Sequence, residues 1–174
     1  WWGEKFLEAL EEITDYGRLQ RGRSYSKPNR LLKFEINNNK INSRIRGNIN
    51  HYFGVYEEPK YDVKIELKAI SEAKWKKIIK RLAIHSGWLT KLLINEMPDD
   101  IDEAFKDSGV LLLPGDRSDL KTKCSCPDYA NPCKHIAGTY YKVASCLDTD
   151  PFLLFELRGI KREKIFSELA KTSL

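Results

Sequence analysis

The hydrophobic pattern changes from helical to alternating within the first third of the chain. Residues 1–13 place apolar side chains three and four positions apart, the spacing of an amphipathic helix: Phe6, Leu7, Leu10 and Ile13. Gly17 is the expected end of this helix. Three later runs, at residues 32–36, 41–45 and 61–67, alternate apolar and polar residues as half-buried strands do. Because the NNNK stretch between the first two runs favours a turn, the pattern predicts an antiparallel meander with one apolar face.

The apolar face of such a meander needs a covering layer, and residues 71–85 are the predicted cover. Ser71 is a candidate N-cap there, and an apolar stripe follows it at helical spacing: Trp75, Ile78, Ile79 and Leu82. The same periodicity predicts further helices at residues 88–95, in the acidic segment 97–109, at 136–147, at 151–157 and at 160–171. The VLLLPG stretch at residues 110–115 is a short strand or a buried connector.

The composition fits a soluble globular protein, with 41% hydrophobic and 32% charged residues among 174. No stretch approaches the roughly 18 apolar residues that a membrane span requires. The sequence also lacks a signal-peptide pattern, although it begins at Trp1 rather than Met. We therefore expect an intracellular, cytoplasmic protein with no membrane partner.

Positive charge is concentrated near the N-terminal end of the chain. Nine basic residues and one acid lie between Arg18 and Asn48, whereas nine acids and four bases lie between Asn95 and Asp128. A basic segment of this kind can bind a polyanion such as a nucleic acid. The alternative is that these charges only keep a strand surface solvated. The predicted nucleic-acid contacts, with Tyr25 for base stacking, are Arg18, Arg21, Arg23, Tyr25, Lys27, Arg30, Arg44, Arg46, Lys123 and Lys134.

Three of the four cysteines and one of the three histidines fall within twelve residues, CSCPDYANPCKH. Cys124 and Cys126 share one face of a strand, so both thiolates can reach one ion. Cys133 and His135 cannot point the same way inside a regular helix, so we expect Cys133 just before a helix and His135 in its first turn. Three thiolates and one imidazole complete a tetrahedral zinc site with no position left for water. The pattern therefore predicts one structural Zn²⁺.

Other interpretations of the cluster explain less of it. Cysteines packed only as core residues have no reason to adopt this spacing, and a redox CxC dithiol leaves Cys133 and His135 without a role. The CDGSH iron–sulfur proteins also begin with CxC, but three residues separate their last cysteine and histidine, whereas Lys134 alone does so here. Cys146 lies about 16 Å further along the predicted helix and is expected to be a small buried residue.

The stretch CSCPDYANPCKHIAGTYY resembles the SWIM zinc finger, whose signature is CxC followed by CxH. The segments WWGEKFLEAL, QRGRSY, LINEMP and DPFLLFELRG resemble bacterial and archaeal SWIM-finger proteins that accompany SNF2-type ATPases. The resemblance implies zinc ligation by the four cluster residues, and a module that binds DNA or protein. We expect an α+β fold with a small antiparallel β-meander on helices over residues 1–108, followed over 109–174 by the zinc-binding strand–loop–helix module and C-terminal helices.

The sequence contains no GxxxxGK[ST], GxSxG or HExxH motif, so we expect a protein without catalytic activity or a small-molecule substrate. His51 and His85 are isolated, and a solvated helix face explains the acidic cluster of Asp99, Asp100, Asp102 and Glu103. DNA is the first expected partner. The alternative is an adaptor for an SNF2-type ATPase that makes no DNA contact. Its docking surface would include the apolar run of Phe152, Leu153 and Phe155, unless that run packs as core under the finger.

Overall fold

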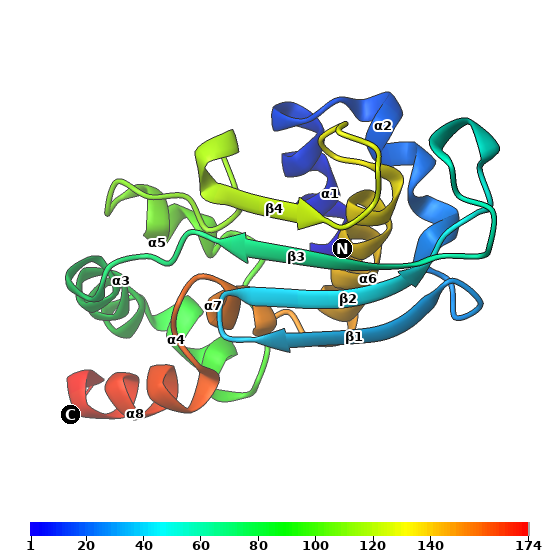
Figure 1. The fold of residues 1–174 in the computed structure, drawn as a ribbon. Helices are drawn as coiled ribbons and strands as arrows, with labels where there is room; N and C mark the ends of the chain where they lie inside the picture. The colour runs from blue at the N-terminus through cyan, green and yellow to red at the C-terminus, as the bar shows by residue number, and fades with distance from the viewer. Residues whose placement is uncertain (174) are drawn as a thin grey trace.

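The computed structural model describes residues 1–173, and it has the predicted α+β architecture (Figure 1). The strands are β1 Leu31–Asn37, β2 Lys40–Arg46, β3 Lys60–Leu67 and β4 Leu120–Cys124. The α-helices are α1 Trp2–Ile13, α2 Tyr16–Arg21, α3 Glu72–Ile84, α4 Ser86–Leu93, α5 Asp102–Lys106, α6 Lys134–Thr149, α7 Leu153–Leu157 and α8 Arg162–Ser173. Short 3-10 turns are η1 Arg23–Ser26, η2 His51–Phe53 and η3 Arg117–Asp119. None of these described helices is both long and apolar enough to cross a bilayer.

The four strands form one antiparallel sheet in the order β1-β2-β3-β4. The predicted meander supplies the first three strands, and β4 joins from the cysteine-rich half of the chain. A register shift between Leu31 and Lys33 places Leu31 opposite Ile45, so Leu32 leaves the apolar face that it was predicted to share with Phe34. Leu32 is 37% exposed, whereas Ile45 on β2 is fully buried.

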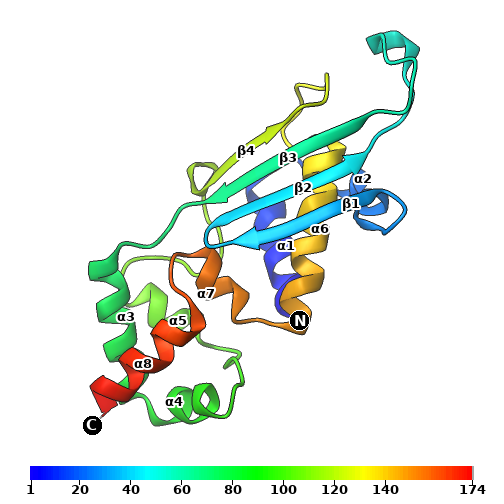
Figure 2. The ribbon, with the colours of Figure 1, turned by 60° about the horizontal axis from the view of Figure 1, so that its bottom comes forward.

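The inner face of the sheet is covered by α6, and α1 packs along α6 on the same side of the sheet (Figures 1 and 2). The prediction that residues 71–85 cover the sheet is therefore wrong, although the helix itself, α3, is present with Ser71 as its N-cap. On another face of α6, Ala137 and Gly138 allow the helix to lie close to Gly22 and Tyr25. A buried hydrogen bond of 2.7 Å between Ser43 on β2 and Thr139 on α6 joins the two layers.

A second helical group lies beyond one end of the sheet and contains α3, α4, α5, α7 and α8 (Figure 2). The Trp75 ring meets Phe105 edge-on at 5.4 Å and Phe155 at 6.0 Å, and its Nε1 donates to the carbonyl of Arg158. Phe152 and Phe155 are buried here, at 4% and 0% exposure. The apolar run of α7 is thus core, as one of the two interpretations held, but it packs on α3 and α5 instead of under the finger.

Two predicted boundaries move in the structure. The first helix ends at Ile13, because Thr14 is extended and the Asp15 carboxylate caps a new helix; Gly17 therefore lies inside α2. The acidic helix is confined to α5, and the following apolar segment is a connector in which Leu112 is buried. The boundary suggested after residue 108 falls in this connector. The elements on its two sides share the sheet and one continuous apolar core.

Candidate metal centre

The four predicted ligands come from three consecutive pieces of backbone. Cys124 ends β4 on the inner face, directly opposite Val63 of β3. Cys126 lies two residues later in the loop, because the strand ends before it. Cys133 is the N-cap of α6, where its sulfur accepts the backbone N–H of Ile136 at 3.4 Å. His135 is in the first turn of α6, so both expected positions at the helix start are observed.

The ligand atoms have the separations of a tetrahedral zinc site. All four lie within 4.8 Å of one another. Nδ1 of His135 is 3.8 Å from the Cys124 sulfur and 3.9 Å from the Cys133 sulfur. Ordinary zinc bond lengths give tetrahedral edges of about 3.6 Å between nitrogen and sulfur and about 3.8 Å between sulfurs. The donor set and its spacing therefore fit Zn²⁺ with only small movements.

The three thiols perturb one another strongly because they are so close. Hydrogen bonds from Cys124 and Cys133 lower the pKa of Cys126. The pKa of Cys124 is raised, first by its hydrogen bonds with Cys126 and Cys133 and then by burial. The pKa of Cys133 is raised to about 11, since the competing effects of its neighbours combine with desolvation. Without a metal ion, the site therefore favours one thiolate and two protonated thiols. A divalent cation is required to keep all three cysteines as thiolates.

Aromatic rings pack against the imidazole of His135, and a hydroxyl bonds to its backbone carbonyl. His135 is 3% exposed and packs against the rings of Tyr25, at 5.3 Å, and Tyr61, at 4.8 Å. Its carbonyl accepts the hydroxyl of Thr139, which in turn bonds to Ser43 on the sheet. Nδ1 faces the sulfurs, while Nε2 is buried with no hydrogen-bond partner among the described residues. Ligation through Nδ1 is consistent with this orientation, because it leaves the proton on Nε2.

Residues 110–144 match the family model of the SWIM zinc finger, and this range contains all four ligands. The chain carries a SWIM zinc finger. Its cysteine and histidine cluster holds one structural zinc ion, with every coordination position supplied by protein. Among residues 1–173, this is the one group of Cys, His or acidic side chains gathered closely enough to bind a metal ion.

The chain is also similar to a protein of Mycobacterium tuberculosis (strain ATCC 25618 / H37Rv) that bears the name Uncharacterized protein Rv2102. The two sequences are 36% identical over 170 residues, which is 98% of this chain and 58% of the relative. The chain thus spans less than two thirds of the length of the curated relative that it matches. No solved structure matches the chain.

The basic residues predicted to contact nucleic acid do not form one surface. Arg18, Arg21, Arg23 and Lys27 lie on α2, η1 and the turn that follows, whereas Arg44, Arg46 and Lys123 lie on the outer face of the sheet. Several are engaged within the protein: Arg18 pairs with Asp15, Arg44 with Asp62 and Arg46 with Glu58, and Arg30 donates to the carbonyls of Arg46 and Gly47.

Tyr25 does not have the exposed ring that its predicted role requires. The side chain is 6% exposed, its hydroxyl accepts the Asn48 amide, and its ring edge meets His135. Arg30 and Lys134 carry their charges over the same ring at 5.3 and 5.4 Å. A base therefore has no free face on which to stack. Tyr25 instead positions the zinc-binding histidine, so its assignment as a nucleic-acid contact is corrected.

The sequence interpretation overlooked a group of exposed aromatic side chains near the finger. Tyr52 is 90% exposed and Tyr56 69%, both in the loop between β2 and β3, and Tyr129 in the finger loop is 101% exposed. The same β2–β3 loop contributes Phe53, which lines a narrow cleft together with Cys126. The sequence does show this group in HYFGVYEEP, where His51, Tyr52, Phe53 and Tyr56 fall within six residues shortly before Pro59.

The remaining candidate groups have local structural roles. The Nδ1 of His85 accepts the backbone N–H of Trp88, and the two rings stack at 3.8 Å, so this histidine caps α4. Asp100 accepts the Trp88 indole N–H, and Asp102 pairs with Lys106 on α5. These contacts give Asp100 and Asp102 partners within their own part of the chain.

Proposed function

We propose that this protein is a non-catalytic nucleic-acid-binding module that binds through the outer face of its sheet. The observation that supports the proposal is the charge on that face, which no described element covers (Figure 1). Strand alternation and the pairing register place eight basic residues against three acids there. The basic residues are Lys33, Lys40, Arg44, Arg46, Lys60, Lys64, Lys121 and Lys123; the acids are Glu35, Asp62 and Glu66.

The most useful charges lie on the two strands nearest the finger. Lys64 on β3 is directly opposite Lys123 on β4, and Lys121 lies two residues away on the same face. All three are exposed, and none forms an ion pair within the described chain. They are therefore free to neutralise phosphates, which is the main source of affinity for nucleic acids.

Exposed rings at one end of the sheet favour single-stranded over double-stranded nucleic acid. Tyr52 and Tyr129 present their rings to solvent from the β2–β3 loop and the finger loop. The two loops border the same cleft beside the zinc ligands. Unpaired bases stack on such rings, and each stacked base contributes about 1–3 kcal/mol. We propose that the finger loop supplies this platform while zinc fixes its position.

In this proposal the zinc ion has a structural role. Cys124 is the last residue of β4, only one position from Lys123, so the metal anchors the strand that carries part of the basic face. With four protein ligands, the ion has no open position at which to bind and activate water. The alternative is an adaptor that docks an SNF2-type ATPase through the run of Phe152, Leu153 and Phe155. Because Phe152 and Phe155 are buried, only the family resemblance supports this alternative.

Fluorescence anisotropy with a labelled single-stranded oligonucleotide tests the proposal. We expect binding at about 50 mM salt that weakens steeply as salt rises. The variant K64Q/K121Q/K123Q should reduce the slope of log affinity against log salt by about 2, since each lost phosphate contact on a single strand removes about 0.7. Tyr52→Ala should weaken binding with little change in that slope.

The matched control is K76Q/K77Q/K80Q, which removes three exposed charges from α3, in the helical group beyond one end of the sheet (Figure 2). Its affinity and salt slope should remain close to those of the unmodified protein. No detectable binding at about 50 mM salt would refute the proposed function. Equal losses in the two triple variants would refute its assignment to the sheet, because a non-specific charge effect predicts that result.

A further inference from the structure

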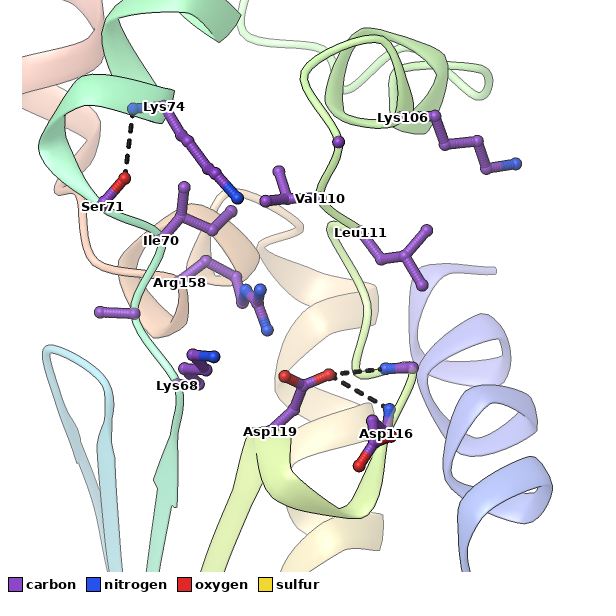
Figure 3. A pocket seen from close by; sticks show the side chains of 13 residues that line it. Lys68, Ile70, Ser71, Lys74, Lys106, Val110, Leu111, Asp116, Asp119 and Arg158 are labelled. Atoms are coloured by element: carbon purple, nitrogen blue, oxygen red, sulfur yellow. Dashed lines mark hydrogen bonds between the residues drawn. The ribbon is translucent and has the colours of Figure 1, made fainter.

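A pocket of about 610 Å³ lies away from both the zinc ligands and the outer face of the sheet. It is formed where the β3–α3 connection, the start of α3, the connector before β4 and the end of α7 meet (Figure 3). Its volume falls within the range of small-molecule sites. Polar and charged side chains line it together with the apolar Ile70, Val110 and Leu111.

Arg158 is the decisive residue of this pocket. Its side chain extends from the end of α7 into the space between Lys68 and Asp119 (Figure 3). The residue is only 4% exposed, and its Nε and Nη1 atoms are buried without a hydrogen-bond partner among the described residues. A buried guanidinium without acceptors is costly, so natural proteins rarely keep one. The orphaned donors indicate that an acceptor from outside the chain completes this site.

The nearby acids do not supply that acceptor. Asp119 raises the pKa of Arg158 through space, but burial acts more strongly and lowers it. No ion pair joins the two side chains, and the Asp119 carboxylate already accepts the backbone N–H groups of Gly115 and Asp116. The Asp116 carboxylate accepts the N–H of Ser118. Both acids therefore shape the loop at the pocket's edge and leave Arg158 unpaired.

Further positive charge converges on the same space. Lys74 points into the pocket from the first turn of α3, and Lys68 lies below Arg158, whereas the Lys106 ammonium points away (Figure 3). The N-terminus of α3, capped by Ser71, also borders the pocket, and helix N-termini favour anions. Three cationic side chains and a helix start thus surround one cavity, which is an arrangement suited to a dianion.

We propose that this pocket binds the phosphate group of a small phosphorylated molecule. Arg158 donates hydrogen bonds to the phosphate oxygens, Lys68 and Lys74 balance its charge, and the organic part lies against Ile70 and Val110. This function is separate from nucleic-acid binding at the sheet, because none of the residues of the basic face lines the pocket. Either property can therefore fail in an experiment without the other.

Isothermal titration calorimetry of the zinc-loaded protein tests the proposal, with pyrophosphate and AMP as probes at matched ionic strength. We expect one site per chain for at least one probe. Arg158→Met keeps the aliphatic stem and removes the donors, and it should weaken binding about 10- to 100-fold, the value of hydrogen bonds to a charged group. Lys77→Met, which removes one exposed charge from α3 outside the pocket, should leave the affinity unchanged.

Thermal unfolding distinguishes a ligand-binding Arg158 from a structural one. Because the free protein buries this charge unpaired, ligand-free Arg158→Met should unfold at the same temperature as the unmodified protein or higher, and pyrophosphate should no longer raise that temperature. A clearly lower unfolding temperature with unchanged probe binding would overturn the proposal. If Arg158→Met does not fold, K68Q/K74Q tests the same pocket from two exposed positions, and unchanged binding in that variant would also overturn it.

A phosphate could also come from the end of a nucleic-acid strand. The comparison is between 5′-phosphorylated and 5′-hydroxyl forms of one short oligonucleotide, each titrated into the unmodified protein and into Arg158→Met. We expect Arg158→Met to leave the difference in affinity between the two oligonucleotide forms unchanged. Heat from the 5′-phosphorylated strand alone, with no binding of pyrophosphate or AMP, would overturn the assignment to a small molecule.

Discussion

Zinc binding to the metal-free protein should release two protons between about pH 7.5 and 9, a window in which ordinary imidazoles are neutral. Cys126 has a lowered pKa and enters this window as the thiolate, so it has no proton to lose. Cys124 and Cys133 have raised pKa values, that of Cys133 being about 11, so both remain protonated until the metal displaces their protons. Two neighbouring thiolates about 4 Å apart repel by roughly 4 kcal/mol at an effective dielectric constant of 20, which explains why one charge excludes the others.

The sign of the pH dependence follows from this count. Raising the pH removes protons with which the metal competes, so zinc affinity should rise about 100-fold per pH unit, or about 2.7 kcal/mol. Competition with a chelator of known pH dependence measures the slope. Calorimetry in two buffers of different ionisation enthalpy measures the number of protons directly. Release of three protons, with a slope near three, would refute Cys126 as a pre-existing thiolate, and a slope near one would refute the predicted count of two protons.

Three further predictions concern the packing around the finger. Cys133→Ala should abolish stoichiometric zinc in metal analysis, whereas Cys146→Ala, outside the cluster, should keep one zinc per chain; equal zinc content would contradict the ligand set. In urea unfolding, Thr139→Val should lower the free energy of unfolding by about 2–3 kcal/mol, because it leaves the buried Ser43 hydroxyl without an acceptor. Ser43→Ala should lower it by only about 1 kcal/mol, because Thr139 still donates to the His135 carbonyl. The reverse order would contradict this direction of the hydrogen bonds. Gly138→Ala should destabilise the protein by about 1–3 kcal/mol, because its Cβ would lie 2.7 Å from that of Tyr25; an unchanged urea midpoint would contradict that close contact.

The metal ligands could be predicted because their chemistry is local. Cys124, Cys133 and His135 lie within twelve residues, so the short chain between them limits the positions that can reach one zinc ion. A strand that ends at Cys124 and a helix that starts at Cys133 meet this requirement without contacts from distant parts of the chain. The three meander strands were predictable for the same reason, since each alternates over a few residues. The bulge at Leu31 was not, because it depends on pairing with β2 and leaves the alternation of the sequence unchanged.

Tertiary partners were the part that local patterns could not provide. The stripe of α3 and that of α6 are both apolar at helical spacing, and periodicity does not say which one meets the sheet. In the structure α6 meets the sheet, and the buried Ser43 to Thr139 bond joins the two. Tyr25 was misassigned for a related reason, because a tyrosine among basic residues in the sequence is buried by a histidine more than a hundred residues away.

The place of β4 at the border of the sheet gives the metal a protective role against self-association. An edge strand presents unpaired backbone groups that can recruit a strand from another molecule. Zinc ties the last residue of β4 to the start of α6, so the metal links this border strand to the helix that covers the inner face of the sheet. We expect loss of the metal to free the finger loop and loosen the border strand before the rest of the apolar core unfolds. Zinc depletion should therefore appear first as aggregation of nearly native protein, with light scattering rising before helical circular dichroism is lost.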